Sequence, residues 1–342
     1  MGAFGRNHAR VYHALQQSGG ARLVAVVDRD MARAHAIAGE FGCGAFGSIE
    51  QMLTAHRQVQ AASVAVPTVL HLEAARKLMK AGIDVLIEKP VAATLTEADE
   101  LARLAREHKR VAQVGHLERF NPAVRATLPL ITHPMFFEVH RLSVFSPRAL
   151  DVDVVLDLMI HDLDVVLTFA KSEVKEIRAV GLPILSGKVD IANVRVEFES
   201  GCVANFTASR VSTERVRKLR FFQPGQYISI DYGRQDVLVF SVVGEAGAPN
   251  AAQFSGQKPA ANLGHTEASV NPQIAVSKPA ITAEEPLLAE IKAFLESVRD
   301  RSHPLISLQD GRRALALALA ILAEIERHAG RIGKTLDVQL QK

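Results

Sequence analysis

The chain has 342 residues and a formal net charge of +3; 48% of its residues are hydrophobic and 23% are charged. This balance is typical of a globular protein that is large enough for two domains. Lys and Arg are scattered rather than gathered into a basic stripe, so nucleic acid is not expected as a partner. The longest apolar run, residues 314–322, is about half of the ~20 residues that a membrane span needs, so no membrane partner is expected either.

The two cysteines, Cys43 and Cys202, lie far apart in unrelated contexts. This usage is typical of a reducing compartment, and together with the lack of a charged-then-apolar leader pattern it predicts a cytoplasmic protein. Neither cysteine belongs to a metal-ligand or redox motif. We therefore expect two buried free thiols and no metal.

Residues 8–116 alternate between helical and strand patterns. Helices are predicted over residues 8–17, 31–42, 49–55, 69–82 and 94–108, and strands over residues 22–30, 61–68, 83–90 and 110–116. Short apolar strands separated by crossover helices indicate a parallel sheet that is covered on both faces. The first part of the chain is therefore predicted to be an α/β domain with a doubly wound parallel sheet.

The pattern changes after residue 120. Strands are predicted over residues 135–145, 174–182, 191–200, 201–211, 218–223, 226–232 and 236–243. Their close spacing predicts an antiparallel sheet, with one helix over residues 154–170 after its first strand. Residues 244–283 are rich in Gly, Pro, Ala, Asn and Ser and predict a long, partly mobile excursion. Two amphipathic helices, over residues 284–300 and 308–330, are expected to serve packing, which includes packing back onto the first domain.

The start of the chain contains Gly2 and Gly5, spaced as the second and third glycines of a dinucleotide-binding G-x-G-x-x-G loop. Asp28 ends the next strand, 23 residues after Gly5, where a carboxylate would accept the ribose hydroxyls. This acid favours NAD, while the adjacent Arg29 leaves NADP open. The alternative is a pair of turn glycines and an unrelated aspartate. The residues expected to contact the cofactor are Gly2, Phe4, Gly5, Asp28, Arg29, Pro67, Glu88 and Lys89.

Glu88, Lys89 and Pro90 end a buried strand, at the edge where open α/β sheets bind ligands. A lysine at the end of an apolar run needs a partner or a task, and beside a ligand it can serve in acid–base chemistry. The alternative is a surface lysine at a strand end, followed by a proline that begins a loop.

Asp157, His161 and Asp164 recur at i, i+4 and i+7 in an otherwise apolar helical segment, so they are predicted to share one face. A histidine with a carboxylate one turn away can abstract a hydroxyl proton near neutral pH. The alternatives are a hydrogen-bonded structural histidine and a metal site, although a metal site would lack its usual fourth ligand. Asp162 is expected to point elsewhere and to be solvated.

Polar residues follow the last strand of the first domain, so connectivity places them near the domain junction. They are His116, Glu118, Arg119 and Asn121, and we expect them to bind substrate together with Arg148. Arg141 and Arg148 are further candidates for gripping an anionic substrate, because arginine captures phosphate and carboxylate groups bidentately. Taken singly, each arginine also fits an ordinary surface or interface position.

In this order, GxxGRNHARV, Asp28, IEKP, VGHLERFNP and DLMIHDLD resemble the Gfo/Idh/MocA family of NAD(P)-dependent sugar oxidoreductases. The resemblance covers essentially the whole chain and implies a Rossmann domain over residues 1–118. A substrate-binding α/β domain with an open, mostly antiparallel sheet is implied over residues 119–342, together with a homodimer or homotetramer. The implied reaction is hydride transfer between the nicotinamide and a sugar or cyclitol carbon. Lys89 matches the lysine of the family's EKP motif, and Asp157 and His161 match its D-x-x-x-H pair, whose histidine is commonly the base.

Two departures from the family pattern stand out. Val154 and Val155 replace the glycines usual before the aspartate, and DLMIHDLD with SPR and ERFNP looks like the branch of bacterial UDP-N-acetylglucosamine 3-dehydrogenases, which serve lipid A or surface-sugar synthesis. That branch implies NAD-dependent oxidation of a sugar nucleotide at C3. The alternatives are a dehydrogenase for a free sugar or inositol, and a non-catalytic nucleotide-binding pseudoenzyme.

The second departure is that the family begins with a strand that runs into the first glycine, whereas this sequence starts within the glycine loop. We expect a misassigned start codon. Without that strand, weak NAD binding and poor stability are expected.

Overall fold

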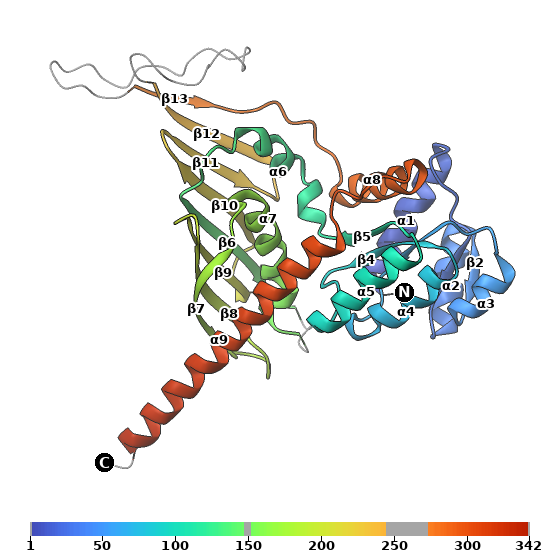
Figure 1. Cartoon of the computed structure of the whole chain (residues 1–342), viewed down its shortest axis with the longest axis horizontal. Coiled ribbons are helices and arrows are strands. Elements are labelled where there is room, and N and C mark those ends of the chain that lie inside the picture. Colours follow the sequence, from blue (N-terminus) through green and yellow to red (C-terminus); the bar gives the residue numbers. More distant parts are fainter. Residues whose placement is uncertain (1, 147–151, 244–272, 341–342) are drawn as a thin grey trace. The chain divides into compact units, whose positions relative to one another are not determined.

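The computed structural model describes residues 2–146, 152–243 and 273–340 (Figure 1). The chain forms two compact units, residues 1–120 with 284–316 and residues 121–283 with 317–342. The structure thus assigns residues 284–316 to the first unit, whereas the sequence placed them in the second domain. Arg148 and most of the predicted excursion over residues 244–283 lie outside the described residues.

The first unit contains five short parallel strands. They are β1 (Ala25–Val27), β2 (Gly44–Phe46), β3 (Ala61–Val64), β4 (Asp84–Glu88) and β5 (Ala112–Gly115). Between and beside them lie the helices α1 (Ala3–Gln17), α2 (Met31–Phe41), α3 (Ile49–Ala55), α4 (His71–Lys80), α5 (Leu95–Glu107) and α8 (Pro286–Asp300). The strands pair as β1–β2 and as β3–β4–β5, so the described residues form two separate parallel sheets.

Strand β3 is an edge strand that pairs with β4. Strand β5 is the other edge strand of this sheet, but the two edge strands differ in burial. All residues of β5 are buried, as are those of the central strand β4, whereas Ala61, Ala62 and Ser63 of β3 are half-buried.

Local sequence explains where the helices begin and end. Thr94 caps α5 in a capping box with Glu97, in which each side chain accepts a hydrogen bond from the other residue's backbone. The Asp30 side chain caps α2, and Gly42 ends it in the left-handed conformation with φ of 66°. These caps fix the lengths of the crossover helices and hence the strand ends, where the candidate site residues stand.

Helix α8 joins the first unit because its apolar stripe completes that unit's core. Ile291 and Phe294 are both fully buried and pack with Val11, Leu15 and Leu86 of α1 and β4. The predicted amphipathic pattern of this helix was therefore right, and the helix packs back onto the first unit although the predicted boundary at residue 119 placed it in the second domain. The reason is that an apolar stripe reveals that a helix packs, but not against which element.

The second unit is built on an eight-stranded sheet in the order β13-β12-β11-β10-β6-β9-β8-β7. Its strands are β6 (Phe136–Val144), β7 (Val174–Leu182), β8 (Ile191–Phe198), β9 (Val203–Ser212), β10 (Val216–Gln223), β11 (Gln226–Asp231), β12 (Asp236–Val243) and β13 (Gln273–Ser277). Only β6 and β9 pair in parallel among these neighbours. The prediction of a mostly antiparallel sheet is confirmed, although β13 begins inside the expected excursion.

A π-helical turn (Val155–Met159) leads into helix α7 (Ile160–Ala170), which lies against one face of this sheet (Figure 1). Phe169 of α7 contacts the rings of Phe137 on β6 and Phe221 on β10, with centroids 6.4 and 5.9 Å apart. The short helix α6 (Pro122–Thr127) and the long helix α9 (Leu308–Leu340) complete the helices used below. No helix in the described part of the chain has the length and apolar character that a bilayer span requires.

Candidate active site

The N-terminus of α1 offers an open backbone surface in the first unit. Gly2 is the exposed N-cap, and a Cβ built on it would meet nothing within 4 Å. The first turn carries no acidic side chain, so the free N–H groups and the positive end of the 15-residue helix suit an anion such as a pyrophosphate. Gly5 is buried and Phe4 is 50% exposed. These features fit the predicted phosphate end of a dinucleotide.

Asp28 directly follows β1, where the ribose of such a cofactor is expected. One carboxylate oxygen accepts the backbone N–H of Asp30 at 2.9 Å, and the other lies 3.7 Å from the guanidinium of Arg33. Arg29 is exposed beside it. The carboxylate can accept ribose hydroxyls, and the two arginines supply positive charge that a 2′-phosphate would need. Arg33 was not predicted as a cofactor residue, because it lies on α2 and not in the loop after β1.

Lys89 follows the last residue of β4 and is half-buried, and its peptide bond to Pro90 is cis. His71 links this loop to the one after β3: its Nδ1 lies 2.9 Å from the carbonyl of Pro90, and its Nε2 lies 3.0 Å from the carbonyl of Val66. Burial lowers the pKa of His71. Pro67, a predicted cofactor contact, is exposed directly after Val66. The link by His71 was not predicted, because a single histidine on a helix carries no specific pattern.

The carboxylate of Glu88 turns into the interior of the first unit, against β5. A Cβ on Gly115 would lie 3.1 Å from the carboxyl carbon of Glu88, so glycine leaves the room that this side chain occupies. His116 is the next residue and is 1% exposed. Burial, and then the charges of Arg119 and Lys89, lower the pKa of His116 to about 3, so it is neutral near pH 7.

The other predicted substrate residues near His116 are buried or bonded to the protein's own backbone. Glu118 is 5% exposed, and the Arg119 guanidinium donates to the carbonyl of Leu305 at 3.3 Å. In the second unit, the Asn121 amide donates to the carbonyl of Tyr232 at 3.0 Å, and its oxygen caps α6. These contacts fix the side chains in place, and their role toward a substrate stays a prediction.

Asp157 and His161 belong to the second unit. Asp157 is half-buried in the π-helical turn, while His161 and Asp164 are 7% and 2% exposed at the start of α7. The prediction of one uninterrupted α-helix over this segment was wrong, because residues 155–159 form the wider turn. π-helical turns occur frequently at functional sites, where they change the direction of side chains.

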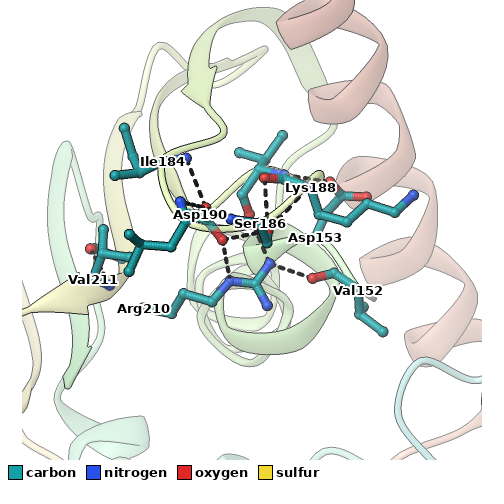
Figure 2. Close-up of polar contacts among 11 residues, drawn as sticks. Val152, Asp153, Ile184, Ser186, Lys188, Asp190, Arg210 and Val211 are labelled. Carbon is teal, nitrogen blue, oxygen red and sulfur yellow. Dashed lines mark hydrogen bonds and ion pairs between the residues drawn. The ribbon is translucent and has the colours of Figure 1, made fainter. Parts of the chain in front are cut away.

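A buried polar network holds the chain just before this turn (Figure 2). The carboxylate of Asp190 accepts backbone hydrogen bonds from Ile184, Leu185 and Ser186 at 2.6–2.8 Å and pairs with the Arg210 guanidinium at 3.0 Å. Burial disfavours the ionised carboxyl, but the hydrogen bonds from Ser186 and the backbone outweigh it and hold the pKa of Asp190 well below its usual value.

Arg210 connects Asp190 to the segment that precedes Asp157. Its guanidinium donates to the carbonyls of Val152 and Val189, while Asp153 accepts the backbone N–H of Val189 at 2.9 Å. The carbonyl of Asp153 in turn accepts the backbone N–H of Asp157 at 2.9 Å. The network therefore fixes the entry to the π-helical turn.

The expectation that Asp162 is solvated was wrong. Asp162 is 1% exposed and forms a two-pronged ion pair with Arg141, at 2.6 and 2.9 Å. The Arg141 guanidinium also lies 5.2 Å from the centre of the Tyr232 ring. Helical spacing gave the direction of Asp162 relative to His161, but it could not show that β6 supplies a buried cation on that side.

Comparison with known proteins supports an oxidoreductase. Residues 1–116 match the model of an oxidoreductase family with an NAD-binding Rossmann fold, and residues 134–230 match the GFO/IDH/MocA C-terminal domain. The UDP-N-acetylglucosamine 3-dehydrogenase of Acidithiobacillus ferrooxidans is 33% identical over 327 residues, which cover 95% of each chain. A solved structure of that enzyme aligns with a TM-score of 0.82 at 31% identity, over 95% of both chains.

Inositol dehydrogenases are also related. The scyllo-inositol 2-dehydrogenase (NAD(+)) of Bacillus subtilis is 26% identical over 227 residues, which cover 62% of this chain and 66% of that enzyme. The scyllo-inositol dehydrogenase of Lactobacillus casei, solved with NAD(H) and scyllo-inositol, shares the fold with a TM-score of 0.74 at 20% identity, over 96% and 95% of the two chains. The chain therefore belongs to the Gfo/Idh/MocA family of oxidoreductases, whose first domain is an NAD-binding Rossmann fold.

Proposed function

We propose that this protein is an NAD-dependent dehydrogenase that oxidises a secondary alcohol of a sugar nucleotide, with C3 of UDP-N-acetylglucosamine as the specific substrate position. The observation that carries the proposal is the 33% identity, over 95% of both chains, to a UDP-N-acetylglucosamine 3-dehydrogenase. Lys89, Asp157 and His161 supply the acid–base groups that such an oxidation needs. NAD, when bound, accepts the hydride from the alcohol carbon.

His161 is the proposed base that takes the hydroxyl proton. Lys89 polarises the same oxygen or relays the proton, and Asp157 orients the pair. His161 stands next to the π-helical turn that the Asp190 network anchors, so its position is fixed by rigid surroundings.

At the other end of the cofactor, the Gly2 end of α1 would hold the pyrophosphate. The carboxylate of Asp28 would hold the ribose. These assignments use the exposed helix terminus and the strand-end acid described above.

The test is NADH formation, followed by its absorbance, with UDP-N-acetylglucosamine, N-acetylglucosamine and myo-inositol offered separately. We expect turnover with the nucleotide sugar and a product that is two hydrogens lighter by mass spectrometry. His161→Ala should lower kcat by 10²–10⁴-fold, the usual share of a general base, and leave NAD affinity unchanged. His133→Ala, a change at an exposed histidine of the same unit, is the matched control.

A second candidate is an inositol dehydrogenase, which the relatives of that activity favour. A higher kcat/KM for myo-inositol than for the nucleotide sugar would establish it in place of the first. NAD binding without turnover of any of the three compounds would instead indicate a non-catalytic nucleotide-binding protein.

Two further proposals concern the setting of the enzyme. Cys43 and Cys202 are free thiols, which supports a reducing compartment such as the cytoplasm; Cys202 is buried as expected, whereas Cys43 is half-buried. A homodimer or homotetramer is proposed from the open sheet of the second unit, and light scattering of the purified protein measures it. A monomer at micromolar concentration would exclude such an assembly.

A further inference from the structure

Three titratable side chains from distant parts of the chain converge inside the first unit. They are His8 of α1, Glu88 at the end of β4 and Glu290 of α8. One nitrogen or oxygen from each lies within 4.8 Å of the other two. Their exposures are 2%, 7% and 0%, so this polar group is enclosed by protein.

The charges of this cluster are not balanced by its own members. His8 Nε2 lies 2.7 Å from Glu88 Oε1, and the remaining oxygen of Glu88 accepts the backbone N–H of Lys89 at 3.3 Å. Neither carboxylate oxygen of Glu290 accepts a hydrogen bond from any residue that the structure describes. Two carboxylates that approach each other in an enclosed site need compensating positive charge. Two protons, or one divalent cation, would supply it.

The donor set has the composition of a transition-metal site. One imidazole nitrogen and two carboxylate oxygens are ligands that Zn²⁺ accepts, with a water molecule as the fourth ligand. The other ring nitrogen of His8 lies 3.0 Å from the Ser63 hydroxyl, which lies 2.9 Å from the Tyr12 hydroxyl. A hydrogen bond to one ring nitrogen of a metal-binding histidine sets the orientation of the ring and leaves the other nitrogen to bind the metal.

We propose that His8, Glu88 and Glu290 bind one divalent transition-metal ion of the zinc type, which joins α1, the end of β4 and α8 within the first unit. The proposed role of the ion is to join these elements, with no part in hydride transfer. No sequence motif indicates this site, because its three ligands lie 80 and 202 residues apart along the chain.

The test begins with the full-length protein, freed of metal by a chelator and titrated with ZnCl₂ by calorimetry, with metal content measured by mass spectrometry. We expect one equivalent to bind, a higher unfolding temperature with zinc, and weaker binding at lower pH because protons compete for the ligands. Glu290→Gln and, independently, His8→Gln should abolish this stoichiometric binding. Ser63→Ala, which removes the partner behind His8, should weaken it about 10–100-fold.

Glu296→Gln is the matched control, because Glu296 is exposed on the same helix. It should bind zinc like the wild type, as should a variant altered only at an exposed histidine. Absence of the one-equivalent site in the wild type would overturn the proposal and assign two protons to the cluster. Equal zinc binding by the wild type, Glu290→Gln and His8→Gln would also overturn it, by placing the bound ion elsewhere. These readouts do not use turnover, so failure of the proposed dehydrogenase activity leaves this test intact.

Discussion

Replacing Asp190 with asparagine tests whether the buried network of Figure 2 holds the entry to the π-helical turn. In the wild type, one carboxylate oxygen of Asp190 accepts three backbone N–H groups, and the other accepts the Ser186 hydroxyl at 2.7 Å and pairs with Arg210. Asparagine has nearly the same shape but only one oxygen. Its NH₂ group must therefore face either the backbone donors or the Arg210 guanidinium.

The magnitude follows from the burial of both partners. The side chains of Asp190 and Arg210 are 0% and 6% exposed, so Arg210 would keep a buried charge without its carboxylate. Removing one partner of a buried ion pair costs about 3–5 kcal/mol, which is a large part of the roughly 5–15 kcal/mol that stabilises a typical domain. Because Arg210 also holds the carbonyls of Val152 and Val189, we expect a lower kcat as well.

The assay is urea unfolding followed by circular dichroism at pH 7.5, together with kcat and NAD affinity. Asp190→Asn should lower the free energy of unfolding by about 3–5 kcal/mol and lower kcat while NAD affinity is kept. Glu176→Gln, the same chemical change at an exposed ion pair with Arg178, is the control and should leave the unfolding midpoint unchanged. A loss below about 1 kcal/mol for Asp190→Asn would refute the reasoning, because it would show that Arg210 does not depend on this carboxylate.

Three further predictions address the first unit. The pKa of His116 is about 3 in the folded protein, against about 6.5 in the unfolded chain. Between these two pH values the unfolded chain binds one more proton than the folded protein. The free energy of unfolding therefore falls as the pH drops below 6.5. From pH 8 to pH 5 the loss in the free energy of unfolding amounts to about 2 kcal/mol. The unfolding temperature of His116→Gln should therefore depend less on pH than that of the wild type. The same pH dependence in both proteins would contradict this prediction. Phe294→Ala should lower the free energy of unfolding by about 3–5 kcal/mol in the urea assay, because Phe294 is fully buried against α1, whereas a loss under 1 kcal/mol would remove α8 from that core. Asp28→Ser should raise the ratio of kcat/KM for NADP to kcat/KM for NAD at least tenfold, because Arg29 and Arg33 then face the 2′-phosphate without the carboxylate. An unchanged ratio would show that Asp28 does not determine which cofactor is used.

Long periodic segments were predictable from the sequence because their patterns are local. The crossover helices and the buried strand that leads to Glu88 follow from residues within a few positions of one another. Strand β2 was missed because Gly44–Phe46 is too short for any period. The Asn121-Pro122 pair that begins α6 carried a cap and a proline at the first helical position, a recognisable helix start that was overlooked.

The candidate site divides along the same line. Lys89, Asp157 and His161 could be named because strand ends and helical spacing indicate where such groups stand. The ion pairs of Asp162 with Arg141 and of Asp190 with Arg210 could not, because each joins strands or helices whose pairing depends on the tertiary fold. The same holds for Glu290 beside Glu88. Polar groups that are buried by distant elements are thus the part of the site that only the structure reveals.

The discontinuous first unit has a consequence for synthesis on the ribosome. Residues 1–120 lack Ile291 and Phe294 of their own core until α8 is made, and the last part of the unit ends at Ala316 in α9. At roughly 5–20 residues per second, synthesis of the intervening residues 121–283 alone takes on the order of 10–30 s. During this interval the apolar sides of α1 and β4 have no final partner. A nascent chain of this protein is therefore expected to need chaperone protection until its C-terminal helices emerge.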